Sequence, residues 1–395
     1  MAATDRPGGE GSEGRGGAAA LMRAALALPV LAIPVRSGAA EVAEIGFSIL
    51  GYKERGLMRV TEPVLWGKLP FGDGWEASAS MVVDIITGAS PQLVSNVSGK
   101  PVQVITGASV DDRRTGGDVK LTKRFDILSV SATRTISDEE DYTSRAFGLE
   151  ASWELNAKLT TLTAGYGKSN DRVGSHDNPR LDERRDTREF LVGVTQVLSP
   201  LALVQSTLVR SLGEGWYNDP YKLTFTVTPG QPPALMPDLR PPERNSWSWL
   251  TRYRQHMPDA RATLQVDYRY FHDDWGIRAH TLEGAWQKDM GEFPGGDATW
   301  ALRPALRYYT QTAARFYSPV IPQPRPAVLS SDQRLGAFGG LSPSLRMVVR
   351  RDSGLTLEGT VGYYQNAGSL RIGGGSPEFE TLRAWYLLGS IVHTF

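Results

Sequence analysis

Apolar and polar residues alternate along most of the chain between Ala43 and Phe395. Over residues 262–270, Ala, Leu, Val and Tyr occupy the even positions, whereas Thr, Gln, Asp and Arg occupy the odd ones. Residues 147–155 and 355–364 follow the same rule. A period of two residues is that of a β-strand with one apolar and one polar face. The pattern therefore predicts a chain built mainly from β-strands.

The connections between these segments alternate in length. Short turns such as 156–158 and 351–354 alternate with longer, more polar stretches such as 87–112 and 212–244. Outer-membrane β-barrels have short periplasmic turns and longer extracellular loops, whereas a soluble β-sandwich has no reason to separate the two. The sequence therefore predicts an all-β fold, a transmembrane antiparallel up-and-down β-barrel in the bacterial outer membrane.

The turns and loops delimit about sixteen strands, an even number that places both chain ends on the periplasmic side. Fourteen strands would remain if the first hairpin did not span the membrane, and eighteen would result if Tyr221–Pro229 paired as part of another hairpin. The predicted strands are 44–53, 57–69, 75–87, 113–125, 127–137, 144–156, 158–168, 187–199, 201–211, 245–256, 261–272, 276–289, 297–311, 336–350, 354–367 and 383–395.

The two ends of the chain carry signals of their own. Arg23, an apolar run and small residues before Glu41 have the layout of a secretory signal peptide. Residues 1–40 are therefore predicted to be an N-terminal extension and signal peptide, and residues 41–395 a single barrel. The final strand ends on Phe395 and resembles the C-terminal signal of outer-membrane barrels, which predicts the barrel-assembly machinery and outer-membrane lipid as partners.

Composition narrows the function classes. The 43 basic and 43 acidic residues give a formal net charge of zero, so no electrostatic case exists for nucleic acid. The absence of cysteine excludes disulfides and thiolate metal sites, and the five histidines are not paired at metal-ligand spacing. No cofactor is expected.

Several short segments match, in order, a known group of barrels. They include "GYKERGLMRV", "VDIITGASP", "ITGASVDDRR" and "EGWYNDPYK" within residues 51–222. On these segments the chain resembles a family of predicted bacterial outer-membrane β-barrels that is catalogued as a domain of unknown function. The resemblance implies a barrel, and family members encoded near a lipoprotein and a thioredoxin-like protein imply an extracytoplasmic redox setting.

The polar face of the predicted strands points into the barrel. A barrel of this width can hold a water-filled passage, and facing bands of opposite charge would select polar solutes, which predicts a pore or channel. Alternatively, these charges pair across the lumen and close it, leaving a non-conducting scaffold that docks periplasmic or lipoprotein partners. The predicted lining residues are Lys120, Arg124, Glu150, Glu154, Arg252, Arg254, Asp267, Arg269, Glu283, Arg303, Arg307, Arg346, Arg350 and Glu358.

The sequence Thr-Gly-Ala-Ser occurs twice, at 87–90 and at 106–109. The strand assignment makes the two copies the shoulders of one extracellular loop, 87–112, because each gives small, flexible backbone suited to a bend. We predict that this loop constricts the mouth of the pore. The residues expected to form the constriction are Asp84, Ser90, Ser109, Asp111, Asp112, Arg113 and Arg114.

Four adjacent carboxylates, Asp138, Glu139, Glu140 and Asp141, lie at a predicted loop tip. Carboxylates can supply the oxygen ligands of Ca²⁺ or another cation, so these residues are a candidate metal site. Their spacing is not that of an EF-hand, and a run of like charges is usually a solvated loop.

An enzymatic function is not expected. His272 stands beside Asp273 and Asp274 at a predicted rim, which makes a rim hydrolase the third hypothesis after a pore and a scaffold. Ser90 and Ser109 are not part of a Gly-x-Ser-x-Gly elbow, and no histidine is near them in sequence.

Overall fold

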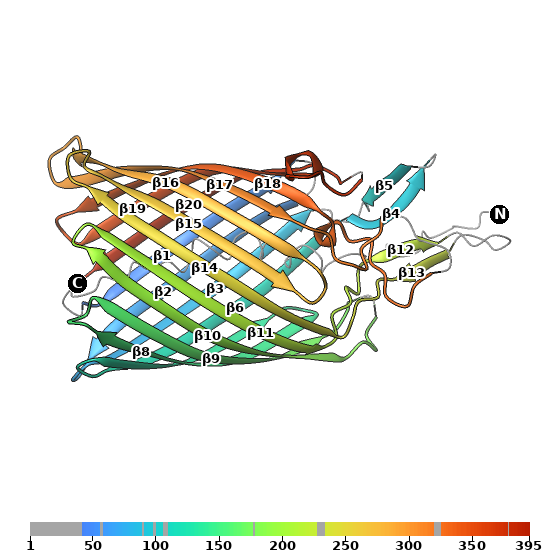
Figure 1. Ribbon diagram of the computed structural model, residues 1–395, viewed down its shortest axis with the longest axis horizontal. Helices are drawn as coiled ribbons and strands as arrows, with labels where there is room; N and C mark the ends of the chain where they lie inside the picture. Colours follow the sequence, from blue (N-terminus) through green and yellow to red (C-terminus); the bar gives the residue numbers. More distant parts are fainter. Residues whose placement is uncertain are drawn as a thin grey trace, which may run out of the picture.

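Sixteen antiparallel strands close into one barrel, which confirms the predicted fold and strand number (Figure 1). The computed structural model describes residues 42–55, 58–88, 91–97, 100–105, 110–176, 178–226, 234–319, 325–377 and 379–395. The predicted signal peptide lies outside these ranges. In the described part, no helix combines the length and the apolar character needed to cross a bilayer.

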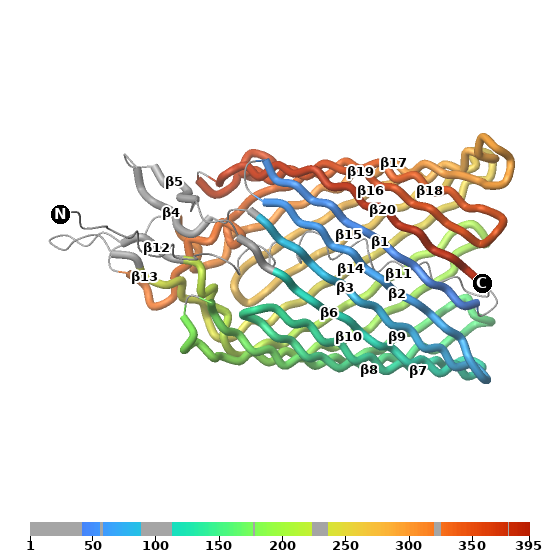
Figure 2. Tube along the Cα trace, turned by 180° about the vertical axis from the view of Figure 1, so that it is seen from behind, coloured from blue at the N-terminus to red at the C-terminus, as the bar shows by residue number. Residues whose placement is uncertain are grey.

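The wall follows the order of the chain, and β20 pairs with β1 to close it. Figure 2 shows these two strands side by side, with the C-terminus at the end of the barrel where β1 begins. The wall strands are β1 (Glu44–Glu54), β2 (Met58–Phe71), β3 (Trp75–Gly88), β6 (Val110–Arg124), β7 (Leu128–Asp138), β8 (Tyr142–Leu155), β9 (Thr160–Val173), β10 (Glu183–Ser199), β11 (Ala202–Gly215), β14 (Glu243–Met257), β15 (Ala262–Asp273), β16 (Arg278–Glu292), β17 (Ala298–Gln311), β18 (Phe338–Arg351), β19 (Leu355–Ala367) and β20 (Leu382–Thr394).

Four short strands form a second sheet beyond the barrel, at the end opposite the C-terminus (Figure 1). They are β4 (Pro91–Val97), β5 (Lys100–Ile105), β12 (Leu223–Thr226) and β13 (Ala234–Pro237), in the order β13-β12-β4-β5. Of the segment Tyr221–Pro229, residues 223–226 form β12, which pairs with β13 outside the wall. The alternatives of eighteen and fourteen wall strands are therefore wrong.

The outer face of the wall is apolar. Phe47 and Leu65 lie directly opposite each other on β1 and β2, and their side chains are 43% and 51% exposed. On β20, Trp385, Leu387 and Ile391 are likewise exposed on this face. A contiguous apolar exterior has no stable place in water, because each exposed side chain loses the free energy of burial. The exterior therefore meets the hydrocarbon of a membrane.

Tight turns connect the strands at the end that holds the C-terminus. Gly72 and Gly74, at φ +53° and +64°, make the turn from β2 to β3, and a Cβ on Gly74 would lie 2.6 Å from the carbonyl oxygen of Arg124. Asn156, Ala157 and Lys158 also have positive φ between β8 and β9. The longer connections lie at the opposite end, which by the rule for such barrels is the extracellular one.

Candidate functional site: the lumen wall and the extracellular mouth

The predicted lining residues all lie on the face opposite the exposed apolar side chains. On β8, Glu150 and Glu154 alternate with Leu149 and Trp153, whose side chains are exposed on the outer face. The same alternation holds on the other strands, so the structure directs the lining set toward the lumen. The members of this set are Lys120, Arg124, Glu150, Glu154, Arg252, Arg254, Asp267, Arg269, Glu283, Arg303, Arg307, Arg346, Arg350 and Glu358.

Ion pairs in the lumen run along the wall. Arg303 Nη2 lies 3.0 Å from Glu283 Oε1 on the neighbouring strand β16. Arg346 pairs with Glu358 on β19, and Arg254 pairs with Asp267 on β15. These pairs join adjacent strands, so each of them leaves the space at the centre of the barrel uncrossed.

One of these wall contacts skips a single strand. Lys120 Nζ on β6 lies 3.4 Å from Glu150 Oε1 on β8, with only β7 between them. Their side chains keep 36% and 43% of their surface exposed. Partly exposed charges on an inward face indicate that water reaches them inside the barrel.

The two halves of the wall differ in charge. Strands β14 to β18 carry seven inward arginines of the lining set against two carboxylates, Asp267 and Glu283. The sequence prediction did not include Asp118 on β6 or Glu189 on β10, although both alternate with outward apolar residues. The strand alternation is the signal that would have found them, and both add negative charge to the half opposite the arginines.

The residues predicted to constrict the mouth divide into four groups. Asp84 and Arg114 face each other on β3 and β6 and form an ion pair on the inward face. Arg113 lies on the outer face opposite Ile85, so its assignment to the constriction is wrong. Asp111 and Asp112 belong to β6, and Ser90 and Ser109 lie outside the described residues.

The predicted loop 87–112 is shorter than expected because its flanking strands continue to pair. Gly88 of β3 pairs with Val110 of β6, which leaves 89–109 as the connection. The first Thr-Gly-Ala-Ser copy thus begins inside β3, whereas 106–109 lies outside the described residues. Between them stands the β4–β5 hairpin.

Two loops from distant parts of the wall meet in the extracellular sheet. Leu93 and Val94 of β4 pair in parallel with Leu223 and Thr224 of β12. The β4–β5 hairpin connects β3 to β6, whereas β12 and β13 lie between β11 and β14. Four strands, β7 to β10, separate β6 from β11 in a wall of sixteen. The backbone ladder therefore links two loops that arise from well-separated parts of the wall.

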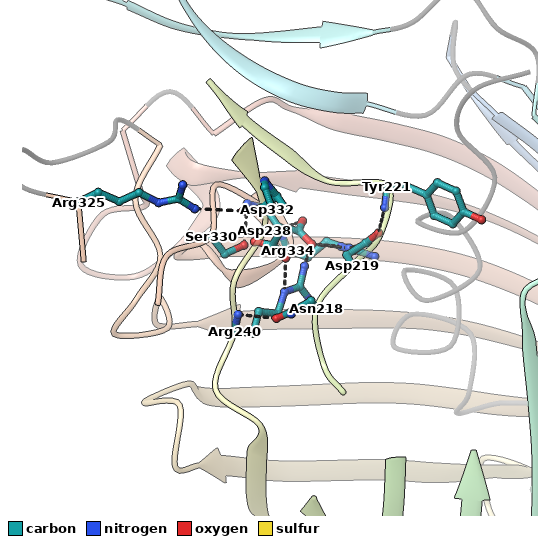
Figure 3. A network of polar contacts seen from close by, with 10 residues as sticks. Asn218, Asp219, Tyr221, Asp238, Arg240, Arg325, Ser330, Asp332 and Arg334 are labelled. Atoms are coloured by element: carbon teal, nitrogen blue, oxygen red, sulfur yellow. Dashed lines mark hydrogen bonds and ion pairs between the residues drawn. The ribbon is translucent and has the colours of Figure 1, made fainter. Parts of the chain in front are cut away.

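A buried ionic cluster joins the β11–β14 loop to the β17–β18 loop (Figure 3). Arg334 donates hydrogen bonds to Asp332 and to Asp219, and Arg240 donates to Asp238 and, at 3.0 Å, to Asp332. The side chains of Asp238 and Asp332 are only 1% and 2% exposed.

Backbone contacts reinforce this cluster. The amide groups of Leu239 and Leu329 donate to each other's carbonyl oxygens at 3.1 and 2.8 Å, and the amide of Arg240 donates to Asn218 Oδ1 at 2.7 Å. The two loops are thus fixed to each other by both main chain and side chain. The sequence prediction described these loops only as polar, because nothing in the pattern shows which charges of separate loops meet.

Burial and charge act in opposite directions on the carboxylates of the cluster. Burial alone would raise the pKa of Asp332, but Arg334, Lys222 and Arg240 hold that pKa well below its ordinary value. Burial raises the pKa of Asp238, and Arg240 only partly opposes this shift. The cluster therefore stabilises the negative charge of Asp332, and Arg334 and Arg240 likewise lower the pKa of Asp219.

Three of the four carboxylates of the candidate metal site have separate side-chain partners. Asp138 accepts a hydrogen bond from Thr143 Oγ1 at 2.7 Å, Glu140 Oε1 lies 3.1 Å from His176 Nδ1, and Asp141 accepts from the Tyr221 hydroxyl. The amide of Glu139 donates to the carbonyl of Tyr142. No group of three or more His, Asp or Glu side chains with metal-binding geometry occurs among the described residues.

His272 and Asp273 point to opposite faces of β15. His272 lies on the outer face, opposite Trp247 and Arg278. Asp273 is buried on the inner face, where it accepts hydrogen bonds from Arg244 Nη2 at 2.8 Å and from the amide of Ile277 at 2.8 Å. The carboxylate of Asp273 is thus occupied by a guanidinium and an amide, and these two neighbours in sequence do not form a histidine–aspartate pair.

A family model described as "Protein of unknown function (DUF3570)" matches residues 18–182 and 175–382 of the chain. The similar solved structures include a "Bacterial polysaccharide outer membrane secretin", with 8% identity, coverage of 90% of this chain and 99% of that chain, and a TM-score of 0.50. They also include OccK3 (OpdO) of Pseudomonas aeruginosa, at 11% identity, 90% and 96% coverage and a TM-score of 0.43. The outer membrane protein opdK of Pseudomonas aeruginosa has 9% identity, 89% and 98% coverage and a TM-score of 0.44. A comparison with curated proteins found no match.

Proposed function

We propose that this chain, which belongs to the DUF3570 family and folds as an outer-membrane β-barrel, is a pore for small polar solutes or ions. The observation that carries the proposal is the direction of the lumen ion pairs. Arg303–Glu283 and Arg346–Glu358 join neighbouring strands, and Lys120–Glu150 skips one. Charges that are neutralised along the wall leave the passage lined with polar groups and open to water.

Charge on the wall supports a preference among solutes. The arginines of β14 to β18 face a half of the wall that carries Glu150, Glu154 and Glu189. Opposed bands of charge create a transverse field that orients a dipolar solute and favours it over an apolar one. The proposed cargo is therefore small and polar or charged.

The extracellular loops are proposed to restrict the entrance jointly. The first loop carries β4 and β5, and it is held to the β11–β14 loop by the β4–β12 ladder. The buried Asp332–Arg334–Asp219 contacts hold the β17–β18 loop to the same β11–β14 loop. The β11–β14 loop thus contacts both of the other loops. Three connected loops support a narrower mouth than the first loop alone would form.

Single-channel recording of the purified protein in a planar bilayer tests the proposal. We expect discrete conductance steps in KCl, because the inward charges are solvated and a barrel of sixteen strands is wide enough for an aqueous passage. Correctly folded protein, recognised by a gel mobility that changes on boiling, serves as the input. Silence of that folded protein at all voltages would overturn the pore and favour a non-conducting scaffold.

A further inference from the structure

Five basic residues lie together on the outer face of β7 to β11. Arg134 lies opposite Phe147, Phe147 opposite Lys168, and Lys168 opposite Arg188 in one continuous row. Opposed residues on one face have Cβ atoms about 4.5–5.5 Å apart. Arg145 is two residues from Phe147 on β8, and Arg210 lies opposite Phe190 on β11. We call Arg134, Arg145, Lys168, Arg188 and Arg210 the basic collar.

The basic collar marks the extracellular border of the apolar exterior. On β10, the outward positions that follow Arg188 toward the periplasmic end are Phe190, Val192 and Val194, all exposed. On β9, the outward positions before Lys168 are Leu162, Ala164 and Tyr166. On β9 and β10, the outward residues above the collar, toward the loops, are polar, as at Asn170 and Asp186.

Aromatic rings adjoin the collar on the membrane side. Phe147, Tyr166 and Phe190 are 41%, 37% and 46% exposed, and Tyr166 packs against Phe190 with ring centroids 5.3 Å apart. The guanidinium of Arg210 lies over the ring of Trp247, 4.8 Å from its centroid. Aromatic side chains gather at the level of lipid headgroups, so the collar lies where the headgroups of the outer leaflet begin.

The nearest carboxylate on the outer face, Asp186 on β10, accepts a hydrogen bond from Asn170 and is not paired with the collar. Within the described ranges, no carboxylate forms an ion pair with Arg134, Arg145, Lys168 or Arg188. Lys168 and Arg188 nevertheless lie directly opposite each other, and like charges in that arrangement are destabilising. An anion placed between them would remove this repulsion, and guanidinium groups bind phosphate in a bidentate geometry.

We propose that the basic collar binds the phosphate groups of a phosphorylated glycolipid in the outer leaflet. Charge complementarity selects the phosphates, while the apolar and aromatic surface below Phe147 and Phe190 receives the acyl chains. Such a lipid requires the phosphate-binding residues and the apolar surface to lie next to each other. The strands of the barrel wall hold both in place. The site lies on the outer face and is independent of conduction through the lumen.

Binding of bisphosphorylated lipid A by the detergent-solubilised barrel tests the proposal, with native mass spectrometry counting bound lipid. The altered protein is Lys168→Gln/Arg188→Gln. The matched control is Arg180→Gln/Arg184→Gln, which removes the same charge from exposed residues nearer the loops. We expect the collar variant to lose about tenfold in affinity and the control to remain close to the unaltered protein.

Two further probes identify what is recognised. Dephosphorylated lipid A should bind as weakly to the unaltered protein as the bisphosphorylated form binds to the collar variant. Inorganic phosphate should fail to displace the bisphosphorylated lipid, because it lacks acyl chains. Equal affinity of the collar and control variants, or equal binding of dephosphorylated lipid, would overturn the proposal, as would displacement by free phosphate. Gel mobility before and after boiling confirms that each variant is folded.

Discussion

Arg303 and Glu283 lie 3.0 Å apart on adjacent strands of the barrel wall. Their side chains remain 18% and 30% exposed, so the pair is formed at the border of the lumen water. An ion pair in such a position contributes little to stability, because water screens it and replaces it readily. Its larger effect is on the field inside the barrel, since each carboxylate cancels one of the arginines on this half of the wall.

Removing that carboxylate should change ion selectivity. Glu283→Gln leaves Arg303 without its partner and increases the positive charge of the arginine-rich half. We expect the reversal potential in a KCl gradient to shift toward that of chloride, with little change in folding. Asp259→Asn removes a carboxylate from a periplasmic turn and is the control. A shift of equal size in both variants would contradict a role for the inward position of Glu283.

Deleting residues 91–105 should raise the conductance. The deletion removes β4 and β5 and thereby the ladder that holds the first loop to β12. The measurement is the single-channel conductance of the deletion variant against that of the unaltered protein. A variant in which a Gly/Ser segment of equal length replaces 91–105 keeps the length of the loop but lacks the ladder. It therefore distinguishes the effect of the ladder on conductance from the effect of the size of the loop. If the deletion leaves the conductance unchanged, the first loop does not restrict the mouth.

Arg334→Gln should loosen two extracellular loops together. Asp332 and Asp219 would each lose a guanidinium while remaining buried, and breaking a buried pair costs about 3–5 kcal/mol. Hydrogen exchange in residues 234–242 and 325–337 should accelerate in parallel, while exchange in β14 to β18 stays slow. The control is Arg315→Gln, at an exposed residue of the same loop. Acceleration confined to the loop that holds Arg334 would contradict the coupling.

Acid should act on the same two loops. The pKa of Asp332 is lower in the folded protein than in the unfolded chain, where it is about 3.9. Its contribution is therefore complete above that value and is lost as the pH falls through the lower folded pKa. The protection of the loop amides against exchange should not change through protonation of Asp332 between pH 5 and 7, and should fall only below about pH 4. In Asp332→Asn, exchange should be fast throughout this range, and unchanged protection in that variant would contradict the assignment.

Charge should be tolerated on the inner face and not on the outer face. Leu149 is 45% exposed on the apolar exterior, and Gly148, its neighbour, points inward with only ordinary contacts near a Cβ. Leu149→Arg should lower the free energy of unfolding by about 2–4 kcal/mol, the cost of arginine near the middle of a bilayer. Gly148→Arg should cost clearly less, as measured by urea unfolding in lipid vesicles. Equal costs would contradict the assigned faces.

The wall was predictable because its physics is local. Alternation in segments such as 262–270 follows from one face meeting lipid and the other meeting water, so each strand carries its own signal. Turn residues such as Gly72 and Gly74 likewise act within a few positions. The strands at the extracellular end are longer than predicted, as at β6 and β10, because polar side chains on both faces are tolerated outside the membrane.

The extracellular sheet was not predictable in the same way. β12 and β13 have four residues each, too few for a period to be recognised, and the partner of β12 is a parallel strand from another loop. The same holds for the ionic cluster, since Asp219 and Arg334 are 115 positions apart. Partners chosen by tertiary structure leave no mark on the local pattern.

For the lumen, alternation predicted which charges face inward but not how they pair. The partner of a charged side chain depends on the register of its strand against the neighbouring strands. The backbone pairing of β17 with β16 and β18 fixes that register, whereas the spacing of residues within β17 does not. The hypothesis of charges that close the lumen required the lining residues, Arg303 and Glu150 among them, to pair across the barrel. In the structure, each has a partner much closer along the wall.

The junction of β1 with β20 differs from all others in the barrel. Glu44 pairs with Thr394, so this ladder joins the first strand of the wall to the last one. Every other ladder of the wall joins two wall strands that follow each other in chain order. Loop-closure entropy makes such a contact the most demanding to form, and contacts of long sequence separation slow folding. Until it forms, the sheet has two edges whose amide and carbonyl groups are unpaired. We therefore expect closure at β1–β20 to be the rate-limiting event of assembly, and the open sheet to be the form most exposed to aggregation and proteolysis.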